Sequence, residues 1–144
     1  MLRTFILLVL FSLSSDLAAK PNNKVYFYQP ETVTLTGKLF LKTFPGPPNY
    51  ESIKKGDVAE KGWYLKLDKK IDVIINEKKR VPENDNDENE KAVDVIQLAL
   101  PYKKYEEYQR KKNFKVGAKV KLSGTLFRRF TGHHHARVLL SVEE

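Results

Sequence analysis

Residues 33–44, VTLTGKLFLKTF, alternate apolar and polar side chains with the two-residue period of a half-buried β-strand. Val33, Leu35 and Leu39 fall on the apolar face, and threonine or lysine fills most of the other face. Gly37 stands in the middle, where a strand bulges or bends sharply. Strands of small barrels need such a glycine in order to curve, so this stretch predicts a strand of a strongly curved sheet.

Four more segments have the strand pattern, which makes the predicted fold mainly β. They cover residues 63–75, 92–100, 118–130 and 136–144. The apolar phase of the third strand shifts between Val95 and Ile96, as a β-bulge would produce, and Gly124 supplies a second mid-strand glycine. Between the third and fourth strands, Pro101 to Phe114 has the composition of a helix, with proline at the first turn.

This order predicts a small five-stranded OB-fold-like barrel with one helix between strands 3 and 4. A small β-sandwich is the main alternative, and the position of the helix favours the barrel. In an OB barrel, the loop between strands 1 and 2 and the loop between strands 4 and 5 flank the face that binds ligands. We therefore expect at least one histidine of Thr131–His135 to contact the Pro47–Tyr50 segment directly.

The N-terminus has the layout of a secretory signal peptide, residues 1–19. Arg3 supplies the positive charge, Phe5–Leu13 supplies the apolar run, and cleavage is expected after Ala19. The apolar run is shorter than the about 20 residues that a membrane span needs. We expect a periplasmic or secreted single domain over residues 20–144, without a membrane span after cleavage and, because the chain has no cysteine, without disulfides.

The net charge of +8 favours anionic partners in general, although lysine supplies most of it. Arginine is the residue that reads phosphates and bases bidentately, so a solvated lysine-rich surface is the simpler interpretation. Residues 81–92, VPENDNDENEKA, are acidic and polar throughout, and this composition predicts a mobile loop.

Two stretches between the strands carry a family resemblance. They are Gly46–Ser52 (GPPNYES), and Gly124–Phe127 (GTLF) together with Thr131–His135 (TGHHH). With these stretches the chain, from roughly Val33 to Val142, resembles a bacterial secreted family called domain of unknown function 4431. Ala136 stands where the family pattern would have threonine. The resemblance implies no reaction, cofactor or catalytic residue.

The first stretch reads as an ordered loop. Pro47 and Pro48 fix the backbone, Asn49 suits the N-cap of a short helical turn, and Gly56 suits the left-handed position that ends it. Two interpretations remain open: a rigid turn that closes one end of the barrel, or a fixed contact surface that presents Tyr50.

The histidines allow three interpretations. In extended backbone, His133 and His135 would share a face and His134 would oppose them. A metal site would need further ligands, for which Asp57 is the candidate, because zinc sites use three or four protein ligands. The alternatives are weak adventitious binding of nickel or zinc, and a polar loop whose charge changes between about pH 5 and 8.

No motif positions a nucleophile with its base, so we expect neither an enzyme nor a cofactor. The favoured function is a periplasmic binding module that recognises a protein or cell-envelope component, as inhibitor or immunity proteins do. The first alternative is a binder of anionic polymer or single-stranded nucleic acid, although export makes nucleic acid the less favoured ligand. The second is metal binding through the histidines. The predicted binding residues are Pro47, Pro48, Asn49, Tyr50, Thr131, Gly132, His133, His134 and His135.

Overall fold

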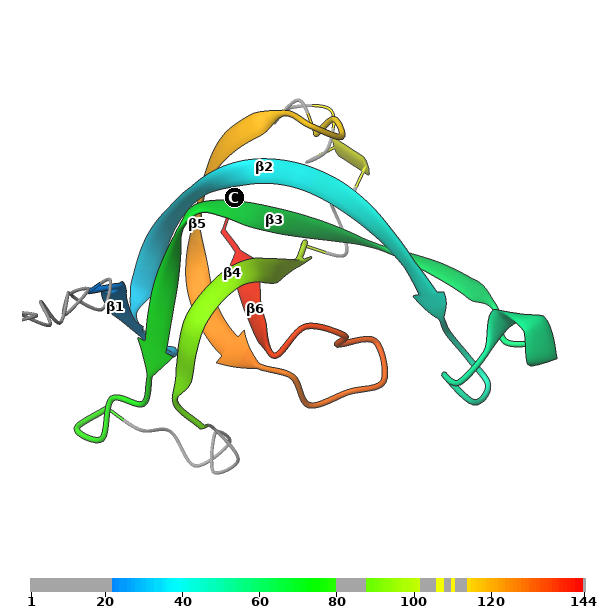
Figure 1. Ribbon diagram of the computed structural model, residues 1–144, viewed down its shortest axis with the longest axis horizontal. Helices are drawn as coiled ribbons and strands as arrows, with labels where there is room; N and C mark the ends of the chain where they lie inside the picture. The colour runs from blue at the N-terminus through cyan, green and yellow to red at the C-terminus, as the bar shows by residue number, and fades with distance from the viewer. Residues whose placement is uncertain (1–21, 80–87, 102–105, 108–109, 111–113, 144) are drawn as a thin grey trace, which may run out of the picture.

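The computed structural model describes residues 22–79, 88–101, 106–107, 110 and 114–143, and the predicted signal peptide lies outside them. Six strands form one sheet within these residues (Figure 1). Their bounds are β1 (Lys24–Phe27), β2 (Thr32–Pro45), β3 (Ala59–Ile74), β4 (Glu90–Ala99), β5 (Lys119–Arg128) and β6 (Val138–Val142), with a short 3-10 helix, η1 (Ile53–Lys55), between β2 and β3. No helix in this part of the chain is long and apolar enough to cross a membrane.

Five of the strands close into a ring. β2 pairs with β3, β3 with β4, β4 with β6, β6 with β5, and β5 again with β2. The β4–β6 pairing is parallel and the other four pairings of the ring are antiparallel. This is the strand arrangement of an OB-fold barrel, so the predicted OB-fold-like barrel is confirmed.

The sequence did not predict β1, which lies parallel to the end of β3, with Lys24 opposite Ile71 and Phe27 opposite Ile74. Four residues are too few to show an alternating pattern, and most of the side chains of β1 are exposed. Directly after β1, Tyr28 is only 1% exposed, and its hydroxyl donates to the carbonyl oxygen of Glu88 at 3.1 Å. β1 therefore extends the sheet beyond the ring and leads into the core.

β2 changes its neighbour at Gly37. Thr32–Lys38 pairs with β5 and Gly37–Pro45 pairs with β3, so the two ladders overlap only at Gly37 and Lys38. A Cβ atom on Gly37 would lie 2.2 Å from the carbonyl oxygen of Lys66, which leaves no room for any side chain. The glycine that the sequence placed at a bend is therefore the corner of the barrel.

Gly124 plays the same part in β5. Lys119–Thr125 pairs with β2, and Gly124–Arg128 pairs with β6. A Cβ atom on Gly124 would lie 2.0 Å from the carbonyl oxygen of Ser141. Both long, bent strands thus pass from one partner to the next at a residue without a side chain.

The alternating apolar residues of the strands fill the barrel. Trp63 packs edge-on against Phe114, with ring centroids 5.3 Å apart. The most deeply buried aliphatic members of the core are Leu39, Leu65, Val73, Ile96, Leu126, Val138 and Leu140.

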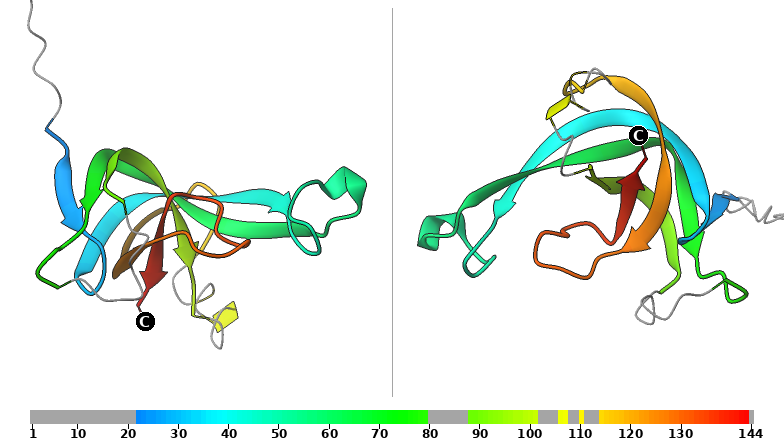
Figure 2. Two further views of the ribbon diagram at one scale, coloured as in Figure 1. Left: turned by 90° about the horizontal axis from the view of Figure 1, so that it is seen from below. Right: turned by 180° about the vertical axis from the view of Figure 1, so that it is seen from behind.

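Beyond the barrel, β2 and β3 continue together as an arm, residues 41–62 (Figures 1 and 2). Its tip is the loop of residues 46–58, which contains η1. The loop of residues 129–137, between β5 and β6, lies beside the arm in both figures. The arm therefore brings the first of the two unusual sequence stretches to the second.

Three local predictions need correction. The helix expected over Pro101–Phe114 is not among the described elements: most of that stretch lies outside the described residues, and only Glu106, Glu107 and Arg110 have helical backbone. The ladder of β3 and β4 shifts register twice: between Val93 and Val95, where β3 contributes extra residues, and between Glu90 and Val93, where β4 contributes one. The predicted position between Val95 and Ile96 is wrong, because these two residues pair regularly.

The C-terminal boundary of the mobile loop predicted over residues 81–92 is also wrong. Residues 80–87 lie outside the described part, but Glu90 already begins β4. Glu90 is only 6% exposed and pairs with Arg137 at 2.7 Å. The composition of the segment could not predict the burial of Glu90. A buried carboxylate is tolerated only where a cation pairs with it, and here that cation comes from a distant part of the sequence.

Gly37→Ala should destabilise the protein by about 3 kcal/mol or more, the upper end for overpacking, because its methyl group would meet backbone atoms that cannot turn aside. Gly62→Ala is the matched control, since its Cβ would meet the side chain of Tyr64 at 3.2 Å. Urea denaturation of both variants measures the difference. Equal stabilities of the two variants would contradict the close approach at Gly37.

Candidate functional site

The loop of residues 46–58 is organised around one carboxylate. Asp57 is only 5% exposed. Its oxygens accept hydrogen bonds from the backbone N–H groups of Asn49 (3.0 Å), Glu51 (2.8 Å) and Ser52 (2.7 Å), and from the side-chain amide of Asn49 (3.2 Å). The bond from the Ser52 N–H is the largest cause that lowers the pKa of Asp57 from its ordinary value of 3.8, and it outweighs the opposing effect of burial. Asp57 therefore stays ionised and holds the loop in one conformation.

Asn49 does not cap a helix, as the sequence predicted. The helical turn begins later, at η1, and the residue before it, Ser52, makes no side-chain cap hydrogen bond. Asn49 binds Asp57 instead, because that carboxylate is within reach of both its N–H groups. The prediction for Gly56 is confirmed: it ends η1 in the left-handed region with φ of 107°.

Gln97 of β4 fixes the histidine loop, residues 129–137. Its side-chain N–H donates to the carbonyl oxygen of His133 at 2.7 Å, and its side-chain oxygen accepts from the N–H groups of His135 (2.7 Å) and Ala136 (3.1 Å). Only 8% of Gln97 is exposed, so these bonds are shielded from water. The predicted binding residues do not include Gln97. Its only signal was a polar side chain beside Ile96 in an apolar strand.

The two loops touch through His133. Its Nε2 lies 3.2 Å from the Tyr50 hydroxyl, and its Nδ1 lies 2.7 Å from Oε1 of Glu60. The Tyr50 ring also covers Gly132, where a Cβ atom would lie 3.1 Å from the ring. The predicted contact between a histidine and the Pro47–Tyr50 segment is confirmed. We call the joined loops, residues 46–58 and 129–137, the rim.

The other two histidines point into different surroundings. His135 stacks on Phe44 of β2, with ring centroids 3.9 Å apart and planes within 2°. His134 packs edge-on against Phe127 and Phe130, and its Nδ1 accepts the N–H of Phe130 at 3.2 Å. His133 and His135 line a common cavity and His134 does not, as the predicted sharing of a face by His133 and His135 would give. However, these residues form a turn, and β6 begins only at Val138, not at Ala136.

The remaining predicted residues form the backbone of the rim. Pro47 and Pro48 are exposed, and the Pro47 carbonyl oxygen accepts the N–H of Val58 at 2.9 Å. Thr131 is exposed as well, and its carbonyl oxygen accepts the N–H of His134 at 3.1 Å. These residues shape the two turns, while Tyr50 and the histidines provide the side chains that meet.

Within the described part of the chain, no group of three histidine, cysteine, aspartate or glutamate side chains is placed to hold a metal ion. The proposed ligand set of His133, His135 and Asp57 is therefore not assembled. The reason lies in Asp57, whose oxygens already accept four hydrogen bonds within their own loop. The carboxylate that does reach a histidine is Glu60, bound to His133.

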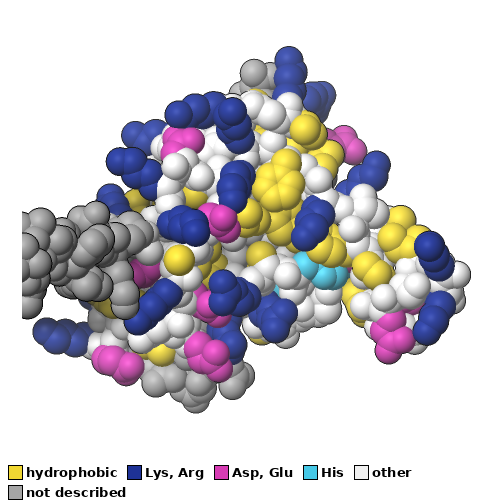
Figure 3. Space-filling view, in the orientation of Figure 1, with side chains coloured by type: hydrophobic (Ala, Val, Ile, Leu, Met, Phe, Trp, Pro, Cys, Tyr) yellow, Lys and Arg dark blue, Asp and Glu magenta, His cyan; other side chains and the backbone are white. Residues whose placement is uncertain are grey.

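An aromatic face lies next to the rim, on the outside of the barrel. Tyr64 of β3 packs between Phe40 and Phe44 of β2, with ring centroids 5.4 and 5.6 Å away, and the Phe44–His135 stack continues the row. In Figure 3, hydrophobic side chains cross the middle of this face toward the visible histidine, with lysine and arginine on both sides. OB barrels bind ligands on the corresponding face.

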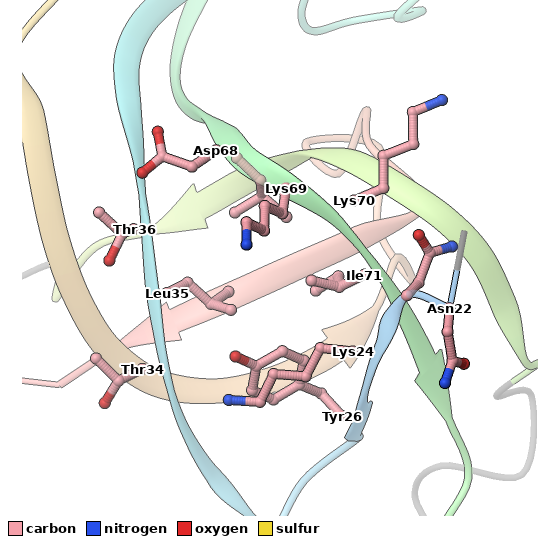
Figure 4. Close-up of a pocket in the computed structure, with 12 residues that line it drawn as sticks. Asn22, Lys24, Tyr26, Thr34, Leu35, Thr36, Asp68, Lys69, Lys70 and Ile71 are labelled. Carbon is pink, nitrogen blue, oxygen red and sulfur yellow. The ribbon is translucent and has the colours of Figure 1, made fainter.

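A further cavity lies elsewhere in the described part. It has a volume of about 740 Å³ and opens between β1, β2 and the second half of β3 (Figure 4). None of the predicted binding residues lines it; its walls include Lys24, Tyr26, Thr34, Leu35, Thr36, Lys69 and Ile71. The distinctive sequence stretches and this cavity are therefore separate features.

Comparison with known proteins gives one match. Residues 95–144 match the family described as Domain of unknown function (DUF4431). The match includes the TGHHH stretch, Gln97 and the strands β5 and β6, whereas the GPPNYES stretch lies outside the matched residues. No curated protein matches the chain. No solved structure matches it either. The chain is thus similar, over its C-terminal third, to a family whose description gives no function.

Lowering the pH should reduce the stability of the fold, because His134 is protonated more readily in the unfolded chain. Burial, followed by the charges of His133 and His135, lowers the pKa of His134 from its ordinary value of 6.5. The unfolded chain therefore binds the proton first, so this contribution to stability is complete above about pH 6.5 and is lost as the pH falls toward the folded-state pKa. We expect the free energy of unfolding to fall between about pH 7.5 and about pH 5.

The matched variant is His134→Asn, whose side-chain oxygen can accept the N–H of Phe130 but does not titrate. It should show a shallower pH dependence than the wild type in urea denaturation. The pH dependence that remains in this variant comes from His135, because burial also lowers the pKa of that residue. An unchanged slope in His134→Asn would contradict the assignment.

Proposed function

We propose that the protein is an exported binding module and that its partner, a protein of the cell envelope, docks on the rim. The observation that carries this proposal is the link from Tyr50 through His133 to Glu60, which joins the two loops. A surface ordered before binding loses little conformational entropy when a partner docks, and this favours affinity. Asp57 and Gln97 support the same order from within each loop.

Exposed apolar side chains on the arm and the rim favour a protein as the partner. Val58 is 61% exposed and Phe130 is 76% exposed, and both belong to the rim. Ile53 in η1 and Leu41 on the arm are 43% and 40% exposed. Interface centres are formed by large apolar side chains of this kind, surrounded by polar groups such as the histidines and the lysines of η1.

The export signal read in residues 1–19 supports an envelope location for the partner. The size of the chain and its fixed binding loops suit a protein that blocks an envelope-directed toxin or hydrolase by occupying its surface. Such a role needs no reacting group on the rim, only shape and complementary contacts.

The aromatic face favours a second candidate, a binder of anionic polymer such as single-stranded nucleic acid. Phe40 and Phe44 are partly exposed there, and Lys42 lies over the Phe44 ring at 5.1 Å. Aromatic rings beside basic side chains bind single strands by stacking and charge. Such binding weakens steeply with salt because counterions are released, whereas docking through apolar contacts does not.

The test uses the mature protein as bait in envelope extract of the native bacterium at physiological salt, followed by affinity measurement with the recovered partner. Val58→Asp should weaken binding about tenfold or more, since it places a charge in the proposed interface. Val116→Asp is the control, because Val116 has similar exposure, 64%, outside the rim. Equal affinity of the two variants would contradict the proposal. So would the recovery of a polymer that high salt releases, with no protein partner.

A further inference from the structure

Three buried polar atoms beside the rim have no hydrogen-bond partner among the residues that the structure describes: Oε2 of Glu60, the hydroxyl of Tyr64 and Nε2 of His135. Tyr64 is only 2% exposed. Buried polar atoms are nearly always paired in folded proteins, so three such atoms in one region call for a missing partner. Local distortion is a poor explanation for these unpaired atoms, because the polar groups next to them, Gln97 and Oε1 of Glu60, make short hydrogen bonds.

The residues that carry the three atoms line two cavities that share part of their walls. Tyr64 lines one of about 270 Å³, Glu60 lines another of about 140 Å³, and Phe44 and His135 line both. Because the three atoms have almost no contact with solvent, a ligand must displace neighbouring side chains to reach them. The stacked pair of Phe44 and His135 lies in the walls of both cavities. We call this double cavity the Phe44–His135 pocket.

The chemistry of the three atoms defines the group that fits them. The carboxylate oxygen of Glu60 can only accept a hydrogen bond. Burial raises the pKa of Tyr64 far above its ordinary value of 10.0, so its hydroxyl keeps its proton and can donate. Burial also lowers the pKa of His135, which leaves a neutral ring near neutral pH. A ligand must therefore offer a donor and an acceptor close together, as hydroxyl groups do.

The charges around the pocket argue against an ionic ligand. Lys42, Lys61 and Arg137 line it together with Glu60 and Asp94. Arg137 is paired with Glu90, and Asp94 is paired with Lys66. A cation would meet the lysines, and an anion would meet the unpartnered oxygen of Glu60. The larger of the two cavities, about 270 Å³, is just below the about 300 Å³ at which ligand pockets usually begin, and this size suits one small ring.

We propose that the Phe44–His135 pocket binds a neutral, hydroxyl-rich ligand of the carbohydrate class, about one sugar ring in size, whose hydroxyl groups pair with Glu60, Tyr64 and His135. The aromatic rings supply the apolar surface against which the C–H groups of a sugar pack. This site goes beyond the docking surface on the rim and does not depend on a protein partner.

The test titrates the purified mature protein with glucose, galactose and N-acetylglucosamine, and separately with methylguanidinium and inorganic phosphate. Chemical shifts of Phe44, Tyr64 and His135 report binding. We expect at least one sugar to shift these signals saturably and neither ion to do so. Tyr64→Phe should weaken sugar binding about tenfold without lowering the melting temperature, because the lost hydroxyl has no protein partner.

Tyr26→Phe, in the wall of the 740 Å³ cavity, is the matched control and should bind the sugar as the wild type does. Absence of saturable shifts with every sugar would overturn the proposal and leave ordered water as the partner of the three atoms. Preferred binding of either ion would overturn the ligand class, and unchanged affinity of Tyr64→Phe would overturn the assignment of the pocket. Because Val58→Asp affects only the rim, its effect on partner binding separates failure of this proposal from failure of the docking surface.

Discussion

At Gly37 the backbone of β2 runs so close to β3 that the carbonyl oxygen of Lys66 lies 2.2 Å from the place where a side chain would begin. Here β2 leaves β5 and continues along β3 alone. Gly124 allows β5 to pass from β2 to β6 in the same way. These two close approaches of the backbone, at Gly37 and Gly124, set the direction of the arm. The direction of the arm in turn brings the two loops together at its end.

The polar groups that stabilise the rim come from outside the stretches that make it distinctive. Gln97 reaches the histidine loop from β4, and Glu60 reaches His133 from the start of β3. Asp57 closes its own loop from the far end of the η1 turn. Each is shielded from water at least in part, where hydrogen bonds are stronger and an unpaired group is costly. Tyr50 holds a left-handed backbone with φ of 59°, a conformation that such support can maintain in a bulky residue.

Much of this organisation could be predicted from the sequence. The two-residue period predicted the strands of the barrel, and the mid-strand glycines predicted its corners. OB topology predicted that a histidine would contact the Pro47–Tyr50 segment. These features are local patterns or consequences of a known topology. What escaped prediction depends on pairing between distant residues. Gln97 looks like any polar residue in a strand, and β1 is too short to show a period. The unpartnered atoms of Tyr64 and His135 become visible only when burial and partners are known.

The central claim is that the barrel corners bring the two loops into direct contact, and the Tyr50–Gly132 pair tests it most directly. A Cβ atom on Gly132 would lie 3.1 Å from the Tyr50 ring, so an α-proton of this glycine faces the ring. In a nuclear Overhauser experiment on the mature protein, we predict a strong cross-peak between the Tyr50 ring protons and a Gly132 α-proton, with that α-proton shifted by the ring current. Absence of the cross-peak, with both residues at the shifts of an unstructured chain, would contradict the account.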